Sequence, residues 1–168
     1  MPRVLADGKT KFTILTTAPA DPAAPTAAEL NAGIDLSCKV LATDFEFGPT
    51  DSETIDEAAL CDDGAALAYG RSNASIGFTL WRYYLEAGGV DTSEDAGFEA
   101  VKVKGATLWG YKRVTDKPST EDWEAGDEIA YGSEFTNDTP QVQSGGWIKA
   151  RVPGQPQKHY PFIEVATA

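Results

Sequence analysis

Short runs in which apolar and polar residues alternate recur along the chain, and this period of two limits the possible folds more than any other feature. The runs KFTILTT and IDLSCKVL alternate, whereas SIGFTLWRYYL is apolar on both faces, as expected for strands with one or two buried faces. Further strands are expected in ATLWGYKRV, DEIAYGSEF, GWIKARV and HYPFIEVA, which are separated by turns containing glycine or proline. The sequence therefore predicts an all-β fold, a β-sandwich or barrel of two packed antiparallel sheets.

Helix is expected in two short segments at most. Thr26 and Glu29 have the spacing of a capping box ahead of Leu30. The segment from 90 to 105 fits either a strand or a helix that begins near Thr92 and ends at Gly105, and we favour the helix. At 168 residues the chain is long enough for one core, so we expect a single domain over residues 1–168 with one flanking α-helix.

Acidic residues are concentrated in two stretches that contain no lysine or arginine. Residues 40–70 hold eight of the 26 acids and residues 118–148 hold seven, in a chain of net charge −12. Binding to nucleic acid through its phosphates requires clustered basic residues, so it is not expected. Within the first stretch, TDSETIDEAAL has only Ile55 and Leu60 as large apolar residues. It is therefore expected to be an exposed excursion.

Residue types that carry catalysis or bind metals are scarce. His159 is the single histidine, so a histidine metal cluster cannot form within one chain. We expect no enzyme activity, no cofactor and no metal. Cys38 alternates with the exposed positions of its run, so we expect Cys38 and Cys61 to be buried free thiols, with a disulfide as the alternative. No apolar run is long enough to span a membrane, so no membrane partner is expected.

Basic residues outnumber acidic ones at both ends of the chain, opposite to the middle. Residues 1–12 contain Arg3, Lys9 and Lys11 against Asp7, and residues 149–168 contain Lys149, Arg151 and Lys158 against Glu164. Two interpretations remain open. The acids form a solvated face and the basic ends are incidental, or copies associate head to tail, with basic ends meeting acidic loops.

Several segments, in their order along the chain, resemble the tail tube (major tail) proteins of long-tailed, non-contractile bacteriophages (siphoviruses), particularly those that infect actinobacteria. These are LADGKTKFTILTTAPADPAAPTAAELNAGIDLSCKV, DFEFGPTDSETIDEAALCDDG, SNASIGFTLWRYY, GFEAVKVKGATLWGYKRV and GWIKARVPG. The resemblance covers essentially the whole chain. It implies a structural virion protein that assembles in the host bacterial cytoplasm into homohexameric rings. The rings stack helically into the hollow tail tube.

The resemblance also implies partners and contact segments. The tube passes double-stranded genomic DNA as cargo that it does not bind, and it meets the tape measure, terminator and tail tip proteins. An exposed loop at about 47–60, an N-terminal arm at about 1–10 and a C-terminal arm at about 153–168 are expected to contact neighbouring rings. The candidate contact residues are Arg3, Lys9, Thr50, Asp51, Ser52, Glu53, Thr54, Ile55, Arg151 and Lys158.

The acidic stretches suggest how such a conduit avoids binding DNA, because carboxylates on a channel wall repel phosphates. We hypothesise that a set of acids faces the lumen or a seam between rings. These are Asp44, Glu46, Asp56, Glu57, Asp62, Asp63, Glu121, Asp122 and Glu124.

Two other functions remain as alternatives. A β-sandwich module that binds carbohydrate or another ligand would use exposed tryptophans to stack on sugars. Trp81 and Trp109 lie in apolar runs and are expected in the core, whereas Trp123 and Trp147 flank turns and remain candidates for such stacking. A small acidic hydrolase would need a carboxylate pair with defined geometry, for which the sequence has no signature.

Overall fold

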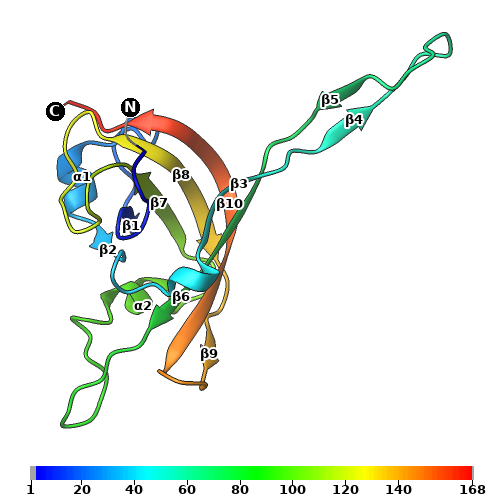
Figure 1. Ribbon diagram of the computed structural model, residues 1–168. Coiled ribbons are helices and arrows are strands. Elements are labelled where there is room, and N and C mark those ends of the chain that lie inside the picture. Colours follow the sequence, from blue (N-terminus) through cyan, green and yellow to red (C-terminus); the bar gives the residue numbers. More distant parts are fainter. Residues whose placement is uncertain (1–2, 168) are drawn as a thin grey trace.

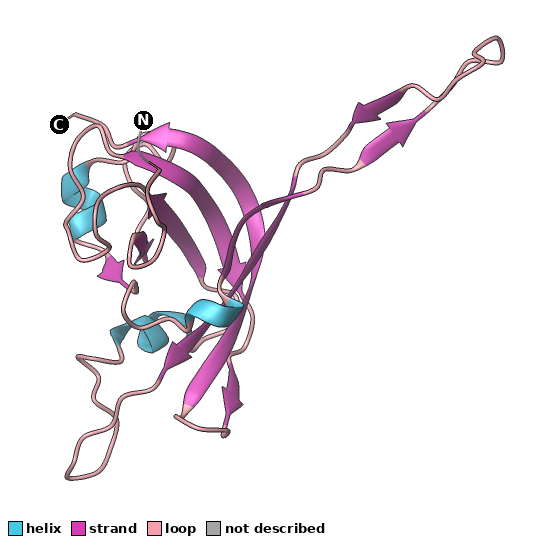
Figure 2. Ribbon diagram, in the orientation of Figure 1, coloured by secondary structure: helices cyan, strands magenta, loops and turns pink. Residues whose placement is uncertain are grey.

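The computed structural model describes residues 3–167. The strands are β1 (Thr10–Leu15), β2 (Ile34–Asp35), β3 (Glu46–Thr50), β4 (Thr54–Asp56), β5 (Leu67–Tyr69), β6 (Asn73–Trp81), β7 (Thr107–Val114), β8 (Glu128–Asn137), β9 (Gln141–Gln143) and β10 (Lys149–Glu164). The helices are α1 (Ala27–Asn31), α2 (Ala96–Val101) and a 3₁₀ turn η1 (Ala42–Asp44). The predicted all-β class is confirmed (Figure 2).

One strongly curved sheet forms the body of the protein. Its strand order is β2-β1-β7-β8-β10-β6-β3, with β9 pairing beside β10, and every pairing is antiparallel. Although β1 and β3 lie near opposite ends of this order, the Phe12 ring lies 4.9 Å from that of Phe47 in β3 and 5.4 Å from that of Phe78 in β6. The sheet therefore curls around its own core as an open barrel (Figure 1).

Aromatic rings fill the barrel and need glycine opposite them. Phe47, Phe78 and Phe135 are buried and meet edge to face, an arrangement that the ring quadrupoles favour. A Cβ at Gly110 in β7 would lie 2.6 Å from the Phe47 ring. Glycine at this position therefore lets β3 pack across the inside of the barrel.

A second layer covers the outer face of β1 and β7. Thr26 caps α1, and Glu29 completes the predicted capping box. Leu30 of this helix packs with Leu15 and Trp123 in a second core, and Trp123 Nε1 donates to Thr13 Oγ1 at 3.0 Å. Adjacent positions of β1 thus point into two different cores, because side chains alternate along a strand.

The last strand, β10, is a single long strand, although its prolines suggested two separate ones. GWIKARV and HYPFIEVA were predicted as separate strands, and residues 153–168 as a C-terminal arm, but residues 149–164 form β10 in the interior of the sheet order. Beyond Gly154, β10 pairs with β8 alone, with a register shift between Pro156 and Lys158. Proline has no backbone N–H, and this loses no hydrogen bond where the strand has no neighbour on that side. The part of β10 that pairs only with β8 can therefore accommodate Pro156 and Pro161. Residue 168 lies outside the described residues.

The strand predicted over 34–41 ends after two residues. The Asp35 carboxylate accepts hydrogen bonds from the Ser37 amide (2.9 Å) and hydroxyl (2.5 Å), a local bond that favours a turn over a ladder. Cys38 therefore leaves the strand and is exposed, and Cys61 is exposed as well. The prediction of two buried thiols is wrong, although both are free.

The ambiguous segment near residue 100 contains a helix, as favoured, but only from 96 to 101. The Asn137 side-chain amide donates to the carbonyl oxygens of Val101 (2.5 Å) and Val103 (3.1 Å). The first bond satisfies a carbonyl that the end of the helix leaves free, and the second holds the turn that follows. Gly105 then turns the chain with a φ of +86°, a conformation that glycine adopts without a steric penalty.

Asp35 should make the stability depend on acid. Burial raises the pKa of its carboxyl, but hydrogen bonds from Lys11 and Ser37 lower it by more, so the net pKa is below its ordinary value. This stabilisation is present above the unfolded-state pKa of about 3.9 and is lost as the pH falls through the folded-state pKa. The free energy of unfolding should therefore be steady near neutral pH and fall below about pH 4.

Urea denaturation at about pH 7 and about pH 3 measures this dependence. Asp35→Asn should be less stable near neutral pH, because it leaves Lys11, whose side chain is 3% exposed, without its carboxylate. It should also lose less stability on acidification. Equal losses in the variant and the unmodified protein would contradict the assignment.

Candidate functional site

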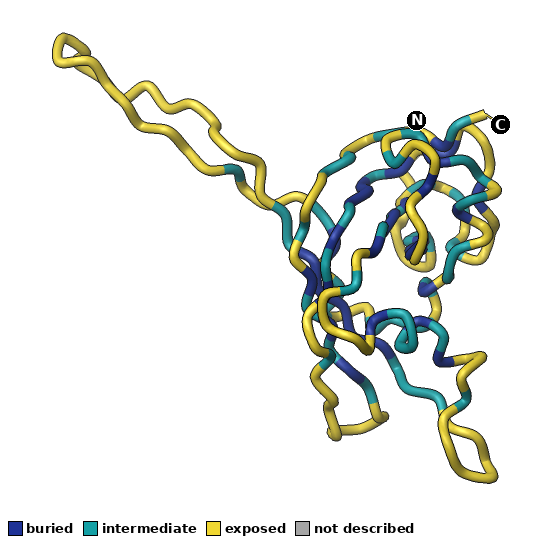
Figure 3. Tube along the Cα trace, turned by 180° about the vertical axis from the view of Figure 1, so that it is seen from behind, coloured by how far each residue is buried: buried dark blue, intermediate teal, exposed yellow. Residues whose placement is uncertain are grey.

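A long hairpin projects from the barrel between β3 and β6. Residues 51–72 leave the main sheet, and β4 and β5 pair only with each other (Figure 1). Every residue from Glu53 to Asn73 is exposed (Figure 3). The exposed loop expected at 47–60 thus starts later and extends farther, because Phe47 is 2% exposed and belongs to the core.

The base of the hairpin is anchored in the barrel. β3 and β6 remain paired from Glu46–Gly77 to Thr50–Asn73. Behind them, the Lys112 ammonium of β7 donates to the Phe47 carbonyl oxygen, and burial lowers the pKa of Lys112. The hairpin is therefore a continuation of β3 and β6, and the parts of these strands inside the barrel are fixed by their own pairing and by Lys112.

Arg151 of β10 ties the hairpin base to the neighbouring strand. Its guanidinium lies 3.3 Å from the Asp44 carboxylate and 3.8 Å from that of Glu46, and it donates to the Asp44 carbonyl oxygen at 2.7 Å. The Arg151 side chain is only 23% exposed. The structure thus gives Arg151, a candidate contact between rings, a role inside its own chain, together with two of the candidate lumen acids.

The two faces of the hairpin differ in chemistry. Leu67 and Tyr69 lie two residues apart on β5 and therefore share a face, and they are 65% and 84% exposed. Ile55 lies on the other face, where its side chain contacts Gly70. This pair of exposed apolar side chains, with Thr54 and Asp56 opposite them on the same face, is a candidate surface for contact with another protein.

Arg113 holds the loop of residues 115–127, which lies across the barrel from the hairpin. The guanidinium is buried and lies 2.9 Å from the Asp127 carboxylate, and it also donates to the carbonyl oxygens of Pro118, Glu121 and Asp122. Burial raises the pKa of Asp127, but hydrogen bonds from Lys117, the Glu124 amide and Arg113 together bring it below its ordinary value. This acidic loop is therefore fixed to the barrel by a buried cation.

Comparison with models of known protein families identifies the family of the chain. A family model described as phage tail tube protein matches residues 1–168. The chain belongs to the phage tail tube protein family. A search of curated proteins finds no match. Tail tube proteins are structural components of the virion, which self-assemble and meet other tail proteins, and the family is not a known enzyme family.

The tail tube protein does not gather its candidate acids into one surface. Asp56, Glu57, Asp62 and Asp63 lie on the outer part of the hairpin, whereas Glu121, Asp122 and Glu124 lie on the loop beside α1, across the barrel (Figure 1). The two groups are exposed but far apart, and Glu124 also pairs with Lys117 at 2.6 Å. The two groups therefore lie on separate surfaces of one copy, and their place at the lumen or at a seam stays a prediction.

The remaining candidate contacts divide between the hairpin and the barrel. The outgoing arm of the hairpin carries Thr50, Asp51, Ser52, Glu53, Thr54 and Ile55. Arg3 is exposed, Lys9 donates to the Asp116 carbonyl oxygen, and Lys158 pairs with Glu134 at 3.7 Å. Residues 1–2 of the expected N-terminal arm lie outside the described residues. Sequence reasoning missed Leu67 and Tyr69, whose signal is an apolar pair that follows the acidic run.

The tryptophans bear on the carbohydrate-binding alternative. Trp123 is 2% exposed and belongs to the second core, so it is not the exposed stacking residue that the turn beside it suggested. Trp147, in contrast, is 83% exposed. Trp81 and Trp109, both expected in the core, are partly buried in β6 and β7. Trp109 packs against the second core, whereas Trp81 lines an open groove.

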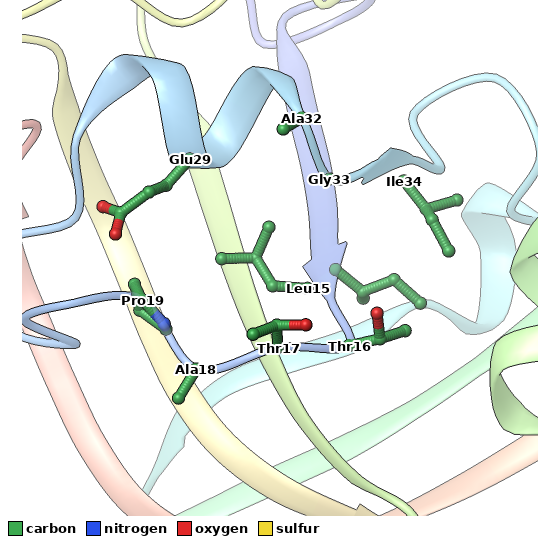
Figure 4. A pocket seen from close by; sticks show the side chains of 10 residues that line it. Leu15, Thr16, Thr17, Ala18, Pro19, Glu29, Ala32, Gly33 and Ile34 are labelled. Atoms are coloured by element: carbon green, nitrogen blue, oxygen red, sulfur yellow. The ribbon is translucent and has the colours of Figure 1, made fainter.

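A groove between β1 and α1 offers no catalytic arrangement (Figure 4). Its single ionisable side chain is Glu29, whose carboxylate accepts from the amides of Ala20 and Thr26. These bonds lower the pKa of Glu29, the Ala20 bond most of all. Among residues 3–167, no group of three or more metal-ligating side chains could hold an ion, and no helix is long and apolar enough to cross a membrane.

Proposed function

We propose that this tail tube protein forms homohexameric rings that stack helically into a hollow siphovirus tail tube, through which double-stranded DNA passes into the host. The tube is built in the bacterial cytoplasm and contacts the tape measure, terminator and tail tip proteins. The observation that carries the proposal is the hairpin of residues 51–72, an extended arm with an exposed apolar face that leaves its own barrel.

An arm of this kind favours association between copies. A two-stranded hairpin alone is at best marginally stable in water, and within residues 3–167 the side chains of Leu67 and Tyr69 stay 65% and 84% exposed. A second copy supplies that cover. Because the arm and its receiving surface are different parts of the chain, the contact is heterologous and repeats without closing, as a stack of rings requires.

The charge supports a conduit that does not bind its cargo. Each copy carries a net charge of −12, and the hairpin acids have one basic neighbour, Arg71, which lies 3.9 Å from Glu53. Acids on a lumen wall repel the phosphates of a duplex across about 8 Å at physiological salt. In this proposal the hairpin acids face the lumen or a seam between rings, and the acids of the 115–127 loop face a different surface.

Negative-stain electron microscopy of the purified protein over a concentration series tests the function. Rings or hollow tubes that lengthen with concentration are the expected result, because the contact between copies follows mass action. A monodisperse monomer at every concentration, together with glycan binding that quenches Trp147 fluorescence, would instead favour the carbohydrate-binding module.

A further inference from the structure

Exposed apolar residues gather at two ends of the molecule. Among residues 3–167, fifteen large apolar side chains are exposed; four lie on the hairpin and six lie at the opposite end of the barrel. These six are Tyr84, Leu85, Val90, Val142, Trp147 and Ile148. Both views of the chain place the two ends apart, with the hairpin above the barrel and the β6–α2 loop and β9 below it (Figures 1 and 3).

Three members of the lower group, Tyr84, Trp147 and Ile148, line a shallow groove together with Trp81, Arg82 and Tyr83. We call these six residues the aromatic patch. The backbone is fixed by the Arg82 amide, which donates to the Ile148 carbonyl oxygen at 3.0 Å. The Arg82 guanidinium stacks on Phe98 at 3.5 Å and pairs with Asp95 at 2.7 Å. The patch is therefore held in place before any partner arrives.

We infer that the aromatic patch of one copy receives the Leu67–Tyr69 face of the hairpin of a second copy. This inference rests on the proposed function and names the surface that accepts the arm. β6 runs from the base of the hairpin at Asn73 to the patch at Trp81, so a donor surface and an acceptor surface lie at the two ends of one strand. Copies joined in this way add along one direction.

Charge complementarity favours this occupant. Residues 51–72 carry six acids and one arginine. The two segments that contribute to the patch, residues 79–85 and 144–153, contain no acid and include Arg82, Lys149 and Arg151, of which both arginines are paired within their own chain. Two nearby acids are already paired, Asp95 with Arg82 and Glu94 with Lys39 at 2.9 Å, whereas Glu86, which follows the first segment, is exposed. In residues 3–167, Lys149 has no carboxylate partner and donates only to backbone oxygens of its own turn, so it is available to a hairpin acid.

Photo-cross-linking identifies the receiving surface directly. A benzophenone amino acid replaces Tyr69, an exposed aromatic residue, and the assembled protein is irradiated and digested for mass spectrometry. The expected cross-link joins the hairpin to a peptide that contains residues 83–85 or 147–148 of another copy. The matched control places the same amino acid at Ala68, on the opposite face of β5, and should give at most a small fraction of that product. Cross-links from position 69 to any other surface would overturn the inference.

A pair of variants tests the contact by changing the receiving surface instead of the hairpin. Trp147→Ser with Ile148→Ser removes exposed side chains and should abolish tubes while leaving a folded protein. Val114→Ser removes an exposed apolar residue at the end of β7, outside the patch and outside the segments expected to contact other rings, and should keep the tubes. Loss of tubes in both proteins, or in neither, would overturn the inference. If the unmodified protein forms no tubes, the proposed function itself fails, so the two failures are distinguishable.

Discussion

Replacing residues 51–72 by the dipeptide Asn-Gly is expected to abolish tube formation and to leave the barrel intact. Thr50 and Asn73 are the last pair of the β3–β6 ladder, and a two-residue Asn-Gly turn joins such a pair in a tight hairpin. The deleted side chains are exposed except for Ser52, which is partly buried. Their removal should change the free energy of unfolding by no more than about 1 kcal/mol.

Sedimentation and electron microscopy measure the assembly, and urea denaturation measures the stability. Tubes formed by the shortened protein at the concentrations that suffice for the full chain would refute the role of the hairpin. Two double variants separate the effect of the Leu67–Tyr69 face from the effect of the hairpin's length. Leu67→Ser with Tyr69→Ser should reduce assembly strongly, whereas Ala66→Ser with Ala68→Ser changes as many residues on the other face and should have little effect.

The hairpin shows what local sequence patterns can predict. A run of acids with only two large apolar residues cannot supply a buried face, so the excursion was predicted from composition alone. The capping box at Thr26 and Glu29 was predicted for a similar reason, because it depends on residues three positions apart. The C-terminal end of the excursion could not be predicted in this way, because Leu67 and Tyr69 alternate with small residues as the residues of a core strand do.

Other features depend on contacts between distant residues. Trp123 flanks a turn and looks exposed in the sequence, but Asn31, 92 positions away, binds its amide and carbonyl oxygen and holds it over β1. Cys38 looks buried by alternation, but the Asp35–Ser37 turn ends the strand before it. The prolines of β10 look like strand breaks because the sequence does not show which side of a strand lacks a neighbour.

Arg113→Ala is expected to cost about 3–5 kcal/mol of unfolding free energy, the range for breaking one side of a buried ion pair. The substitution leaves the Asp127 carboxylate, 7% exposed, without its arginine, and it removes the guanidinium donor from three loop carbonyls, of which that of Pro118 keeps the Glu121 amide. It also removes the cation stacked 5.3 Å from Trp123. Because Lys117 still reaches Asp127 at 2.6 Å, the lower half of the range is expected.

Urea denaturation of the unmodified protein and five variants, Arg113→Ala, Arg113→Lys, Asp127→Ala, Lys158→Ala and Arg113→Ala with Asp127→Ala, separates the contributions to this effect. Arg113→Lys keeps the charge but not the planar fork of donors, so it should recover only part of the loss. Lys158→Ala breaks an ion pair that is 66% exposed on the lysine side and should cost less than about 1 kcal/mol. The double variant Arg113→Ala with Asp127→Ala should be more stable than the sum of the two single changes predicts, because it leaves no unpaired charge. Additive losses, or a loss no larger than that of Lys158→Ala, would mean that the acidic loop keeps its position without the buried cation.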